Sequence, residues 1–344
     1  ACVRAGAIFL PLNTAYTPAE IGYFLGDAEP RVFICDPAQR DKLAAVAGEA
    51  KVAHVETLGA DGKGTMADRI AAANDHFADV ARGPDDLAAI LYTSGTTGRS
   101  KGAMLSHDNL LSNSRTLKDL WRFTADDVLI HALPIFHTHG LFVATNILLL
   151  AGGKLIFMPK FDADLVMRAM PRATSMMGVP TFYTRLLLHP DLSRETTRHM
   201  RLFVSGSAPL LADTHRDWSE RTGHAILERY GMTETNMNTS NPYDGDRVAG
   251  TVGFPLPDVD LRVVDPEKGD VLGRDEIGMI EVKGPNVFKG YWRMPEKTKA
   301  EFRSDGFFIT GDLGKIDARG YVHIVGRGKD LIITGGFNVY PKEV

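Results

Sequence analysis

The amino-acid sequence predicts an α/β protein with mostly parallel sheets flanked by helices, together with a small antiparallel, barrel-like subdomain. Strand-like apolar runs alternate with helical patterns through the first two thirds of the chain, which indicates parallel strands covered by helices. From about Val248 the pattern changes, because short strands at 260–264 and 278–282 are separated by Pro, Gly and Asp turns. Such strands are typical of an antiparallel sheet or barrel. The 344 residues are enough for two or three domains.

The individual elements follow from local patterns. Apolar runs predict strands at 7–12, 31–35, 87–91, 128–133, 154–158 and 201–205. Helical patterns predict helices at 17–26, 107–119, 141–150, 163–169 and 180–188. The first of these has a good start, because Thr17 suits the N-cap and Pro18 the first helical position. Residues 51–83 are polar and rich in Ala and Gly, so we expect a surface excursion that contains a helix.

Composition argues against several classes of protein. The chain is 44% hydrophobic and 24% charged, and its net charge of −4 gives no reason to expect nucleic acid or an anionic membrane as a partner. Cys2 and Cys35 are its only cysteines, which argues against a disulfide framework and fits a cytoplasmic protein. The longest apolar stretch, 140–158, is interrupted by Asn146, Gly152, Gly153 and Lys154, so we expect no membrane insertion. No signal peptide is evident at the first residues.

Residues 92–102 form the most informative segment, with the run Tyr-Thr-Ser-Gly-Thr-Thr-Gly-Arg-Ser-Lys-Gly after an apolar strand. Glycines let the backbone approach a ligand, hydroxyl and N–H groups donate, and a lysine adds positive charge, so the segment suits a polyphosphate. The spacing does not match the common P-loop, and the plain alternative is a flexible surface loop. The residues expected to bind phosphate are Thr93, Ser94, Gly95, Thr96, Thr97, Gly98 and Lys101.

The same run resembles the phosphate loop of the adenylate-forming superfamily, which includes acyl-CoA synthetases, luciferases and peptide-synthetase adenylation domains. Further motifs follow in the superfamily's order, and the resemblance spans essentially the whole chain. They are Leu-Pro-Ile-Phe-His at 133–137, Gly-Ser-Ala-Pro at 206–209, Arg-Tyr-Gly-Met-Thr-Glu-Thr at 229–235, Thr-Gly-Asp at 310–312, Gly-Arg-Gly-Lys-Asp at 326–330 and Gly-Gly-Phe-Asn-Val at 335–339.

The resemblance implies a two-step reaction in which a carboxylate and ATP form an acyl-adenylate, and the acyl group then passes to the thiol of CoA. Thr233 would donate to the α-phosphate, Glu234 would hold Mg²⁺, and His137 would gate access of the carboxylate. Asp312 would accept hydrogen bonds from the ribose hydroxyls. The residues expected around adenine and ribose are Gly206, Ser207, Ala208, Glu228, Arg229, Tyr230, Gly231, Asp312 and Arg327. The alternatives are an exposed charge for Glu234, a core side chain for Tyr230 and a plain turn for Asp312.

The resemblance also implies a domain organisation. Residues 1–247 would form the ATP- and acid-binding subdomains, residues 248–326 the barrel-like subdomain, and residues 327–331 a hinge at Lys329. Residues 332–344 would begin a mobile C-terminal domain, in which Gly335, Gly336 and Phe337 line the CoA tunnel. Compared with the superfamily, we expect an N-terminal segment to be absent, along with the C-terminal domain and the lysine that assists adenylation. A lysine acyltransferase acting on that domain is a further expected partner. The alternatives are a solvated lysine at the hinge and a tight turn at the paired glycines.

The choice of acid depends on three polar residues and Met232. Arg185 follows Phe182 by one helical turn, His139 follows the histidine motif, and Ser207 lies in the Gly-Ser-Ala-Pro segment. A buried arginine needs an anionic partner, which the second carboxylate of a small dicarboxylic acid would supply. This combination looks like that of the malonyl-CoA synthetases, which activate malonate or methylmalonate. The alternatives are a solvent-facing Arg185 and a core histidine bonded to backbone at 139.

The sequence therefore predicts an AMP-forming acid–CoA ligase, with ATP, CoA and malonate or methylmalonate as substrates and Mg²⁺ as cofactor. A second hypothesis is a ligase for a short or aromatic monocarboxylic acid, or an amino-acid adenylation domain. We find no acidic residue near 202–207 to bind an α-amine, which counts against the adenylation domain. A third hypothesis is a non-catalytic nucleotide-binding fragment.

Overall fold

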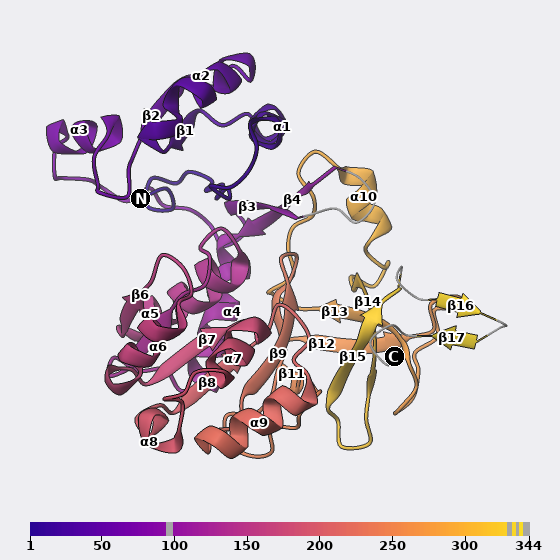
Figure 1. The fold of residues 1–344 in the computed structure, drawn as a ribbon. Coiled ribbons are helices and arrows are strands. Elements are labelled where there is room, and N and C mark those ends of the chain that lie inside the picture. Colours follow the sequence, from indigo (N-terminus) through magenta and orange to yellow (C-terminus); the bar gives the residue numbers. More distant parts are fainter. Residues whose placement is uncertain (94–98, 329–331, 335–336, 340–344) are drawn as a thin grey trace.

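The structure is a computed structural model that describes residues 1–93, 99–328, 332–334 and 337–339. An N-terminal unit, a central mixed sheet with helices on both faces, and an antiparallel sheet follow one another along the chain (Figure 1). The central sheet is parallel-rich and the C-terminal sheet is antiparallel, which confirms the predicted fold class.

In the N-terminal unit, two helices and a short parallel sheet pack around a small core, and a third helix begins beside the second strand. Its elements are α1 (Pro18–Ala28), β1 (Val32–Cys35), η1 (Pro37–Gln39), α2 (Arg40–Glu49), β2 (His54–Thr57) and α3 (Thr65–Ala72). The predicted start of α1 is confirmed, because Thr17 and Glu20 form a reciprocal capping box. Leu25, Phe33 and Leu43 are buried between α1, β1 and α2.

The strand predicted at 7–12 is wrong. Only Phe9 pairs there, through an isolated parallel bridge to Ala89. Pro11 follows, and because proline has no backbone N–H it cannot extend a ladder of hydrogen bonds. The expected helix within 51–83 is present as α3.

An antiparallel hairpin connects the N-terminal unit to the rest of the chain. Its strands are β3 (Leu87–Thr93) and β4 (Lys101–Ser106), and their register pairs Thr93 with Lys101. The hairpin therefore brackets the phosphate-loop motif, of which residues 94–98 lie outside the described part of the chain. On its other side, Ala103 of β4 bridges Tyr291.

The central sheet has the strand order β11-β10-β9-β8-β7-β5-β6, in which the strands from β9 to β6 run parallel. Its strands are β5 (Val128–His131), β6 (Lys154–Phe157), β7 (Ser175–Gly178), β8 (Leu202–Ser205), β9 (Leu227–Met232), β10 (Asn236–Ser240) and β11 (Phe254–Pro255). Its helices are α4 (His107–Leu120), η2 (His139–Thr145), α5 (Asn146–Ala151), α6 (Ala163–Ala169), η3 (Met170–Arg172), α7 (Pro180–Leu187), α8 (Arg194–Thr197) and α9 (Ala212–Thr222).

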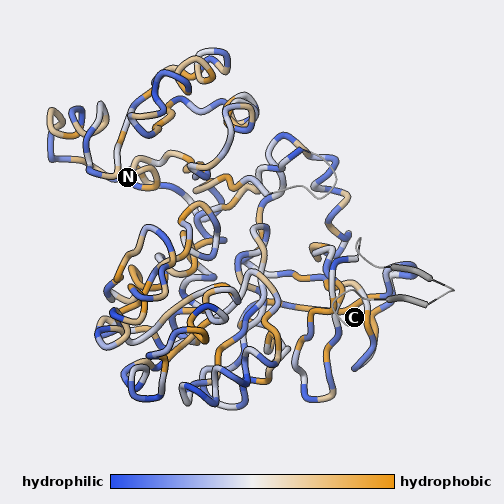
Figure 2. The backbone as a smooth tube through the Cα atoms, viewed as in Figure 1, coloured by the Kyte–Doolittle hydropathy of each residue, from blue (hydrophilic) through white to orange (hydrophobic). Residues whose placement is uncertain are grey.

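Alternating side chains of the inner strands enter separate cores on the two faces of the sheet. Met176 and Phe203 pack with α6, α7 and α9, whereas their neighbours Met177 and Val204 pack with α4 and α5. This is the two-residue period of a strand covered on both faces. Apolar stretches accordingly run through the central strands, and hydrophilic stretches dominate the outer turns (Figure 2).

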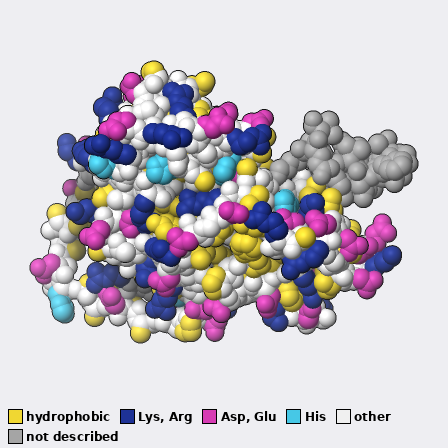
Figure 3. Space-filling model, turned by 90° about the horizontal axis from the view of Figure 1, so that it is seen from below, with side chains coloured by type: hydrophobic (Ala, Val, Ile, Leu, Met, Phe, Trp, Pro, Cys, Tyr) yellow, Lys and Arg dark blue, Asp and Glu magenta, His cyan; other side chains and the backbone are white. Residues whose placement is uncertain are grey.

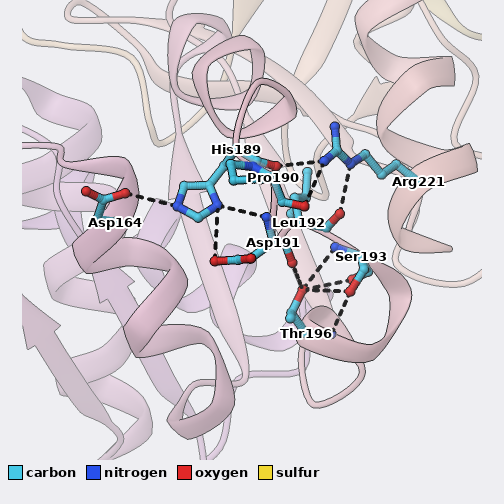
Figure 4. Close-up of polar contacts among 8 residues, drawn as sticks. All are labelled: Asp164, His189, Pro190, Asp191, Leu192, Ser193, Thr196 and Arg221. Carbon is cyan, nitrogen blue, oxygen red and sulfur yellow. Dashed lines mark hydrogen bonds and ion pairs between the residues drawn. The ribbon is translucent and has the colours of Figure 1, made fainter.

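Arg221 of α9 forms hydrogen bonds at the C-terminal end of α7 and with the segment that follows it. Its guanidinium donates to the carbonyl oxygens of Leu187, His189 (2.7 Å) and Leu192 (2.8 Å). Figure 4 shows the contacts with His189 and Leu192. His189 in turn contacts Asp164 of α6 at 3.0 Å. The Leu187 carbonyl at the end of α7 has no intrahelical partner, and Arg221 satisfies it together with two carbonyls of the following segment, so this side chain joins α9 to the end of α7.

The C-terminal antiparallel sheet has the order β12-β13-β14-β15. Its strands are β12 (Asp260–Val264), β13 (Gly278–Lys283), β14 (Phe308–Ile316) and β15 (Val322–Arg327), with α10 (Pro295–Ala300) between β13 and β14. Its buried Ile280 and Phe308 share one core with Leu91 and Ala103 of the hairpin. Beyond it, β16 (Ile332–Thr334) pairs with β17 (Phe337–Val339).

The surface carries charges of both signs. On the face that Figure 3 shows, Lys and Arg side chains are interspersed with Asp and Glu, and hydrophobic side chains gather near the middle. Within the described residues, no helix is both long enough and apolar enough to cross a membrane.

Candidate active site

The candidate residues gather where the parallel strands of the central sheet end. Gly206 directly follows β8, and Tyr230, Gly231 and Met232 form the end of the neighbouring strand β9. Clefts beyond the carboxyl ends of parallel strands are the usual binding sites of α/β proteins. The phosphate hairpin and β14 of the antiparallel sheet bring the remaining residues to this edge.

The turn between β9 and β10 holds Thr233 and Glu234. Gly231 is required before this turn, because a Cβ there would lie 1.8 Å from the backbone oxygen of Asn236. The Glu234 carboxylate is only 6% exposed, and burial raises its pKa. The Tyr291 hydroxyl lies 3.0 Å from its Oε1. A buried carboxylate whose charged form is disfavoured would be stabilised by a nearby cation.

The described flank of the phosphate loop lies beside this carboxylate. The Lys101 ammonium lies 4.1 Å from the centre of the Tyr291 ring and 3.4 Å from Oε1 of Glu301. The Tyr291 hydroxyl also contacts Glu301, at 2.7 Å. Lys101, Tyr291 and Glu301 therefore form one cluster with Glu234.

Tyr230 and Asp312 connect the central sheet to the antiparallel sheet. The Tyr230 hydroxyl donates to Oδ2 of Asp312 at 2.5 Å, and the Arg327 guanidinium lies 2.9 Å from Oδ1. Asp312 of β14 and Arg327 of β15 are directly paired in the strand register. Burial raises the pKa of Asp312, although Arg327 and the Tyr230 hydroxyl partly oppose that shift.

A second polar group lies behind the end of β8. Ser207 has a positive φ of 69°, and its hydroxyl lies 3.2 Å from Nδ1 of His139. His139 is 3% exposed, its Nε2 has no hydrogen-bond partner, and burial lowers its pKa well below the ordinary value. The ring is therefore neutral at physiological pH.

Arg229 is the unusual member of this group. It is 3% exposed, and its Nε and Nη2 atoms have no hydrogen-bond partner within the described structure. Burial lowers its pKa from 12.5 to about 9. Gly206 passes directly over it, since a Cβ on that glycine would lie 2.4 Å from the Arg229 Cζ. An unpaired buried guanidinium is costly, so this position favours an anionic partner.

The expectation that Arg185 is buried is wrong. The side chain is exposed on α7, with its guanidinium 4.8 Å from the centre of the Phe161 ring. The buried face of α7 is formed by Tyr183 and Leu186. Because these two are three residues apart, Arg185 falls on the opposite side of the helix.

The remaining expected residues lie around the same edge or outside the described chain. Glu228 is buried and accepts a hydrogen bond from the backbone N–H of Gly250 at 3.2 Å. His137 is exposed and its ring is 4.5 Å from that of Phe136, while Ala208 is exposed after Ser207. Met232 packs against the core shared with the hairpin. Lys329, Gly335 and Gly336 lie outside the described residues, and Phe337 begins β17.

Three features of the site were not found from the sequence. Tyr291 and Glu301 lie outside the quoted motifs, and they approach Lys101 only through folding. The Arg-Tyr-Gly-Met motif places Arg229 on the adenine side, and its lack of a hydrogen-bond partner is a property of the folded chain.

The predicted boundary at 247/248 stays a prediction, although β11, which follows it, still belongs to the central sheet.

Comparisons with known proteins agree with this arrangement. The family model described as "AMP-binding enzyme" matches residues 1–292. A malonate–CoA ligase of Arabidopsis thaliana is 36% identical over 99% of this chain and 59% of the relative. A feruloyl-CoA synthase of an Amycolatopsis species is also 36% identical, over the whole chain and 68% of the relative.

Among solved structures, ATP-bound MatB from Rhodopseudomonas palustris is 73% identical, with a TM-score of 0.97 over 99% of this chain and 67% of that one. The chain thus spans 59% to 68% of the length of these relatives. The match to the family model covers most of the chain, and it agrees with the motifs and the fold. The protein belongs to the AMP-binding enzyme family of adenylate-forming proteins.

Proposed function

We propose that this protein acts in an ATP-dependent acid–CoA ligase that converts malonate or methylmalonate, ATP and CoA to malonyl-CoA or methylmalonyl-CoA, AMP and diphosphate. The reaction would pass through an acyl-adenylate. The observation that carries the choice of acid is the buried, unpartnered guanidinium of Arg229 beside Ser207 and His139. The similarity to a malonate–CoA ligase and to ATP-bound MatB supports the same choice.

The nucleoside would bind between the ends of β8 and β9 and the antiparallel sheet. Tyr230 would lie against the adenine face, and Gly206 would let the backbone approach the ring. Asp312 offers an acceptor-only carboxylate for the ribose hydroxyls and is already fixed by Tyr230 and Arg327. Glu228 and Gly231 would complete the wall of this pocket.

The phosphates would lie toward the β3–β4 hairpin, with Lys101 and Thr233 as donors. Glu234 fits a role as a Mg²⁺ ligand, because burial raises the pKa of its carboxylate and a bound cation would stabilise the charged form. Among the described residues no group of three or more His, Cys, Asp or Glu could hold a metal, so phosphate oxygens would supply most of the coordination. When bound, Mg²⁺ neutralises charge on the departing diphosphate.

The acid would lie between the α-phosphate and Arg229. One carboxylate would approach the phosphorus past His137, and the distal carboxylate would pair with the Arg229 guanidinium. Ser207 and neutral His139 would add hydrogen bonds to the same group. Such a charge-assisted pairing rejects monocarboxylic acids, because they leave the buried guanidinium without a partner. Arg185 lies on the exposed face of α7, so we assign it no contact with the acid.

The second step would need CoA and a movement about Lys329. Gly335, Gly336 and Phe337 are the proposed lining of the pantetheine tunnel, and a lysine acyltransferase is a proposed regulatory partner of a C-terminal domain. Cys2 and Cys35 are both free, which fits a reducing compartment such as the cytoplasm.

A ligase for an aromatic monocarboxylic acid is the second candidate, because the feruloyl-CoA synthase is as similar in sequence as the malonate–CoA ligase. Arg229 argues against it, since an apolar aromatic acid would bury the guanidinium further without pairing it. A purely nucleotide-binding role is the third candidate.

The test is CoA-dependent AMP release by the full-length protein with malonate, methylmalonate, acetate, butyrate, benzoate and ferulate. We expect malonate or methylmalonate to be preferred over every monocarboxylate by about 100-fold or more in kcat/KM, since a lost charge pair is worth a few kcal/mol. Preference for a monocarboxylate would refute the dicarboxylate assignment. ATP binding without AMP release for any acid would favour the nucleotide-binding role.

A further inference from the structure

The Lys101 cluster gives the phosphate-binding lysine a carboxylate partner. The Lys101 ammonium lies 3.4 Å from Oε1 of Glu301, and both side chains are 20% exposed. The face of the Tyr291 ring is 4.1 Å away on another side. A half-buried ammonium held by a carboxylate and an aromatic face is well stabilised.

The backbone fixes the position of Tyr291. The segment around it pairs with β4 through Met104 N–H to the Gly290 carbonyl (2.9 Å) and Trp292 N–H to the Gly102 carbonyl (2.7 Å). The hydroxyl of Tyr291 then reaches Glu301 at 2.7 Å and Glu234 at 3.0 Å. Tyr291 is therefore a rigid spacer between the carboxylate beside Lys101 and the carboxylate proposed to hold Mg²⁺.

Glu301 is held in place independently of Lys101. It follows α10, and Lys297 of that helix contacts the same Oε1 at 2.7 Å. Burial favours the neutral acid, but the hydrogen bonds from Lys297 and Tyr291 and the charges of Lys101 and Lys297 together lower the pKa of Glu301. The carboxylate is thus an ionised, fixed group, whereas Lys101 is the first residue of β4 and lies near the end of the phosphate-loop motif.

We propose that Glu301 is a positioning residue that holds Lys101 while the phosphate site is empty and yields it to the triphosphate of ATP. This inference rests on the proposed function, in which Lys101 binds the β- and γ-phosphates. The incoming phosphates replace Glu301 as the counter-ion of Lys101, and Glu301 takes the lysine back when diphosphate leaves. The exchange keeps Lys101 oriented between turnovers and lowers the affinity of the site for diphosphate.

The test variant is Glu301→Gln, which keeps the shape of the side chain and an oxygen for the Tyr291 hydroxyl but removes the charge. Glu296→Gln is the matched control, because Glu296 is an exposed carboxylate in α10. Kd would be measured by calorimetry for ATP with Mg²⁺, for inorganic diphosphate, and for AMP. Without its competitor, Lys101 binds phosphates more tightly, so Glu301→Gln lowers Kd for ATP and diphosphate by about three- to tenfold. AMP, which lacks the β- and γ-phosphates, binds unchanged.

A double-mutant cycle with Lys101→Met separates the exchange from simple repulsion between Glu301 and phosphate. The proposal requires the gain from Glu301→Gln to disappear when Lys101 is absent. A gain that persists in the Lys101→Met background, or unchanged affinities in Glu301→Gln, would overturn it. Wild-type protein that fails to bind ATP at all would instead refute the proposed function.

Glu301→Asp guards against a folding defect, and thermal unfolding is recorded for every variant. The shorter carboxylate keeps its charge but retreats from Lys101, so its Kd for diphosphate falls between those of the wild type and Glu301→Gln. A Kd equal to that of the wild type would show that the distance between this carboxylate and the Lys101 ammonium is irrelevant and would contradict the exchange.

Discussion

The hydroxyl of Tyr230, at the end of β9, donates to Oδ2 of Asp312 in β14 at 2.5 Å. This contact joins the central sheet to the antiparallel sheet at the point where the adenosine is proposed to bind. Arg327 holds the other carboxylate oxygen at 2.9 Å. The same buried carboxylate therefore belongs both to the interface between the sheets and to the proposed ribose site.

Tyr230→Phe is expected to weaken both the fold and ATP binding. Loss of one hydrogen bond to a buried carboxylate lowers the free energy of unfolding by about 1–3 kcal/mol, and Asp312 is then less well fixed for the ribose. Tyr321→Phe is the control, because its hydroxyl donates to the Asp246 carbonyl at 2.7 Å, away from the site. Urea unfolding and the Kd for ATP are measured for both. Equal ATP affinity in the two variants would contradict the assignment of Asp312.

Replacement of Arg229 is expected to stabilise the ligand-free protein. Arg229→Met removes an unpartnered buried charge, and exchanging such a group for an apolar one is neutral or stabilising by about 1–4 kcal/mol. Arg201→Met is the opposite case, because Arg201 pairs with the buried Asp127 at 2.7 and 2.8 Å. We expect that change to destabilise by about 2–4 kcal/mol. Chemical denaturation measures the free energy of unfolding of both variants. A large loss of stability in Arg229→Met would indicate a structural partner for Arg229.

Gly231→Ala is expected to disrupt the β9–β10 turn that carries Thr233 and Glu234. The added Cβ would lie 1.8 Å from a backbone oxygen that cannot move without breaking the strand pair. We expect a loss of about 3 kcal/mol or more. Gly48→Ala in α2 is the control, because a Cβ there meets nothing within 4 Å, and alanine should add up to about 1 kcal/mol. A Gly231→Ala protein as stable as wild type would show that this turn tolerates a side chain.

The stability of the protein is expected to fall below pH 6.5 through its buried histidines. Burial lowers the pKa of His215 below its ordinary value of 6.5, and the side chain is 6% exposed. The unfolded chain therefore binds a proton before the folded protein does. Stability that is complete above pH 6.5 is lost as the pH falls from there toward the folded-state pKa, by up to about 1.4 kcal/mol per pH unit.

His215→Gln isolates this contribution. Free energies of unfolding at about pH 7.5 and 5.5 are compared for the variant and the wild type. The variant should lose less stability on acidification, and an identical loss would mean that folding does not lower the pKa of His215.

Much of the fold could be predicted because the parallel strands have a short-range signature. The runs at 128–133 and 201–205 contain β5 and β8, and the capping residues at Thr17 and Pro18 define the start of α1. The motif residues Tyr230 and Asp312 were expected to meet at one nucleotide, and the structure brings them into contact. These features depend on local sequence or on the order of the motifs, so they could be predicted from the sequence alone.

The sequence alone did not identify which of two arginines, Arg185 or Arg229, is buried. The apolar sequence around Arg185 predicts a buried side chain, but Tyr183 and Leu186 form the buried face of α7 and leave Arg185 exposed. The helical period of about 3.6 residues already predicts that Arg185 lies on a different face from Tyr183 and Leu186. Arg229 lies in a strand whose surroundings come from η2 and β8, so its burial and missing partner arise only from tertiary packing. The same holds for Tyr291 and Glu301, which are separated from Lys101 by 190 residues or more in sequence.

The most direct test of the central claim compares Arg229→Met with Arg185→Met in acid-dependent AMP release by the full-length protein. Both changes remove a guanidinium, but only Arg229 is buried without a partner. We expect Arg229→Met to lose at least about 100-fold in kcat/KM for malonate while gaining activity toward butyrate. Arg185→Met should keep the wild-type preference. Loss of malonate activity in Arg185→Met, with Arg229→Met unaffected, would contradict the assignment of Arg229 as the partner of the distal carboxylate.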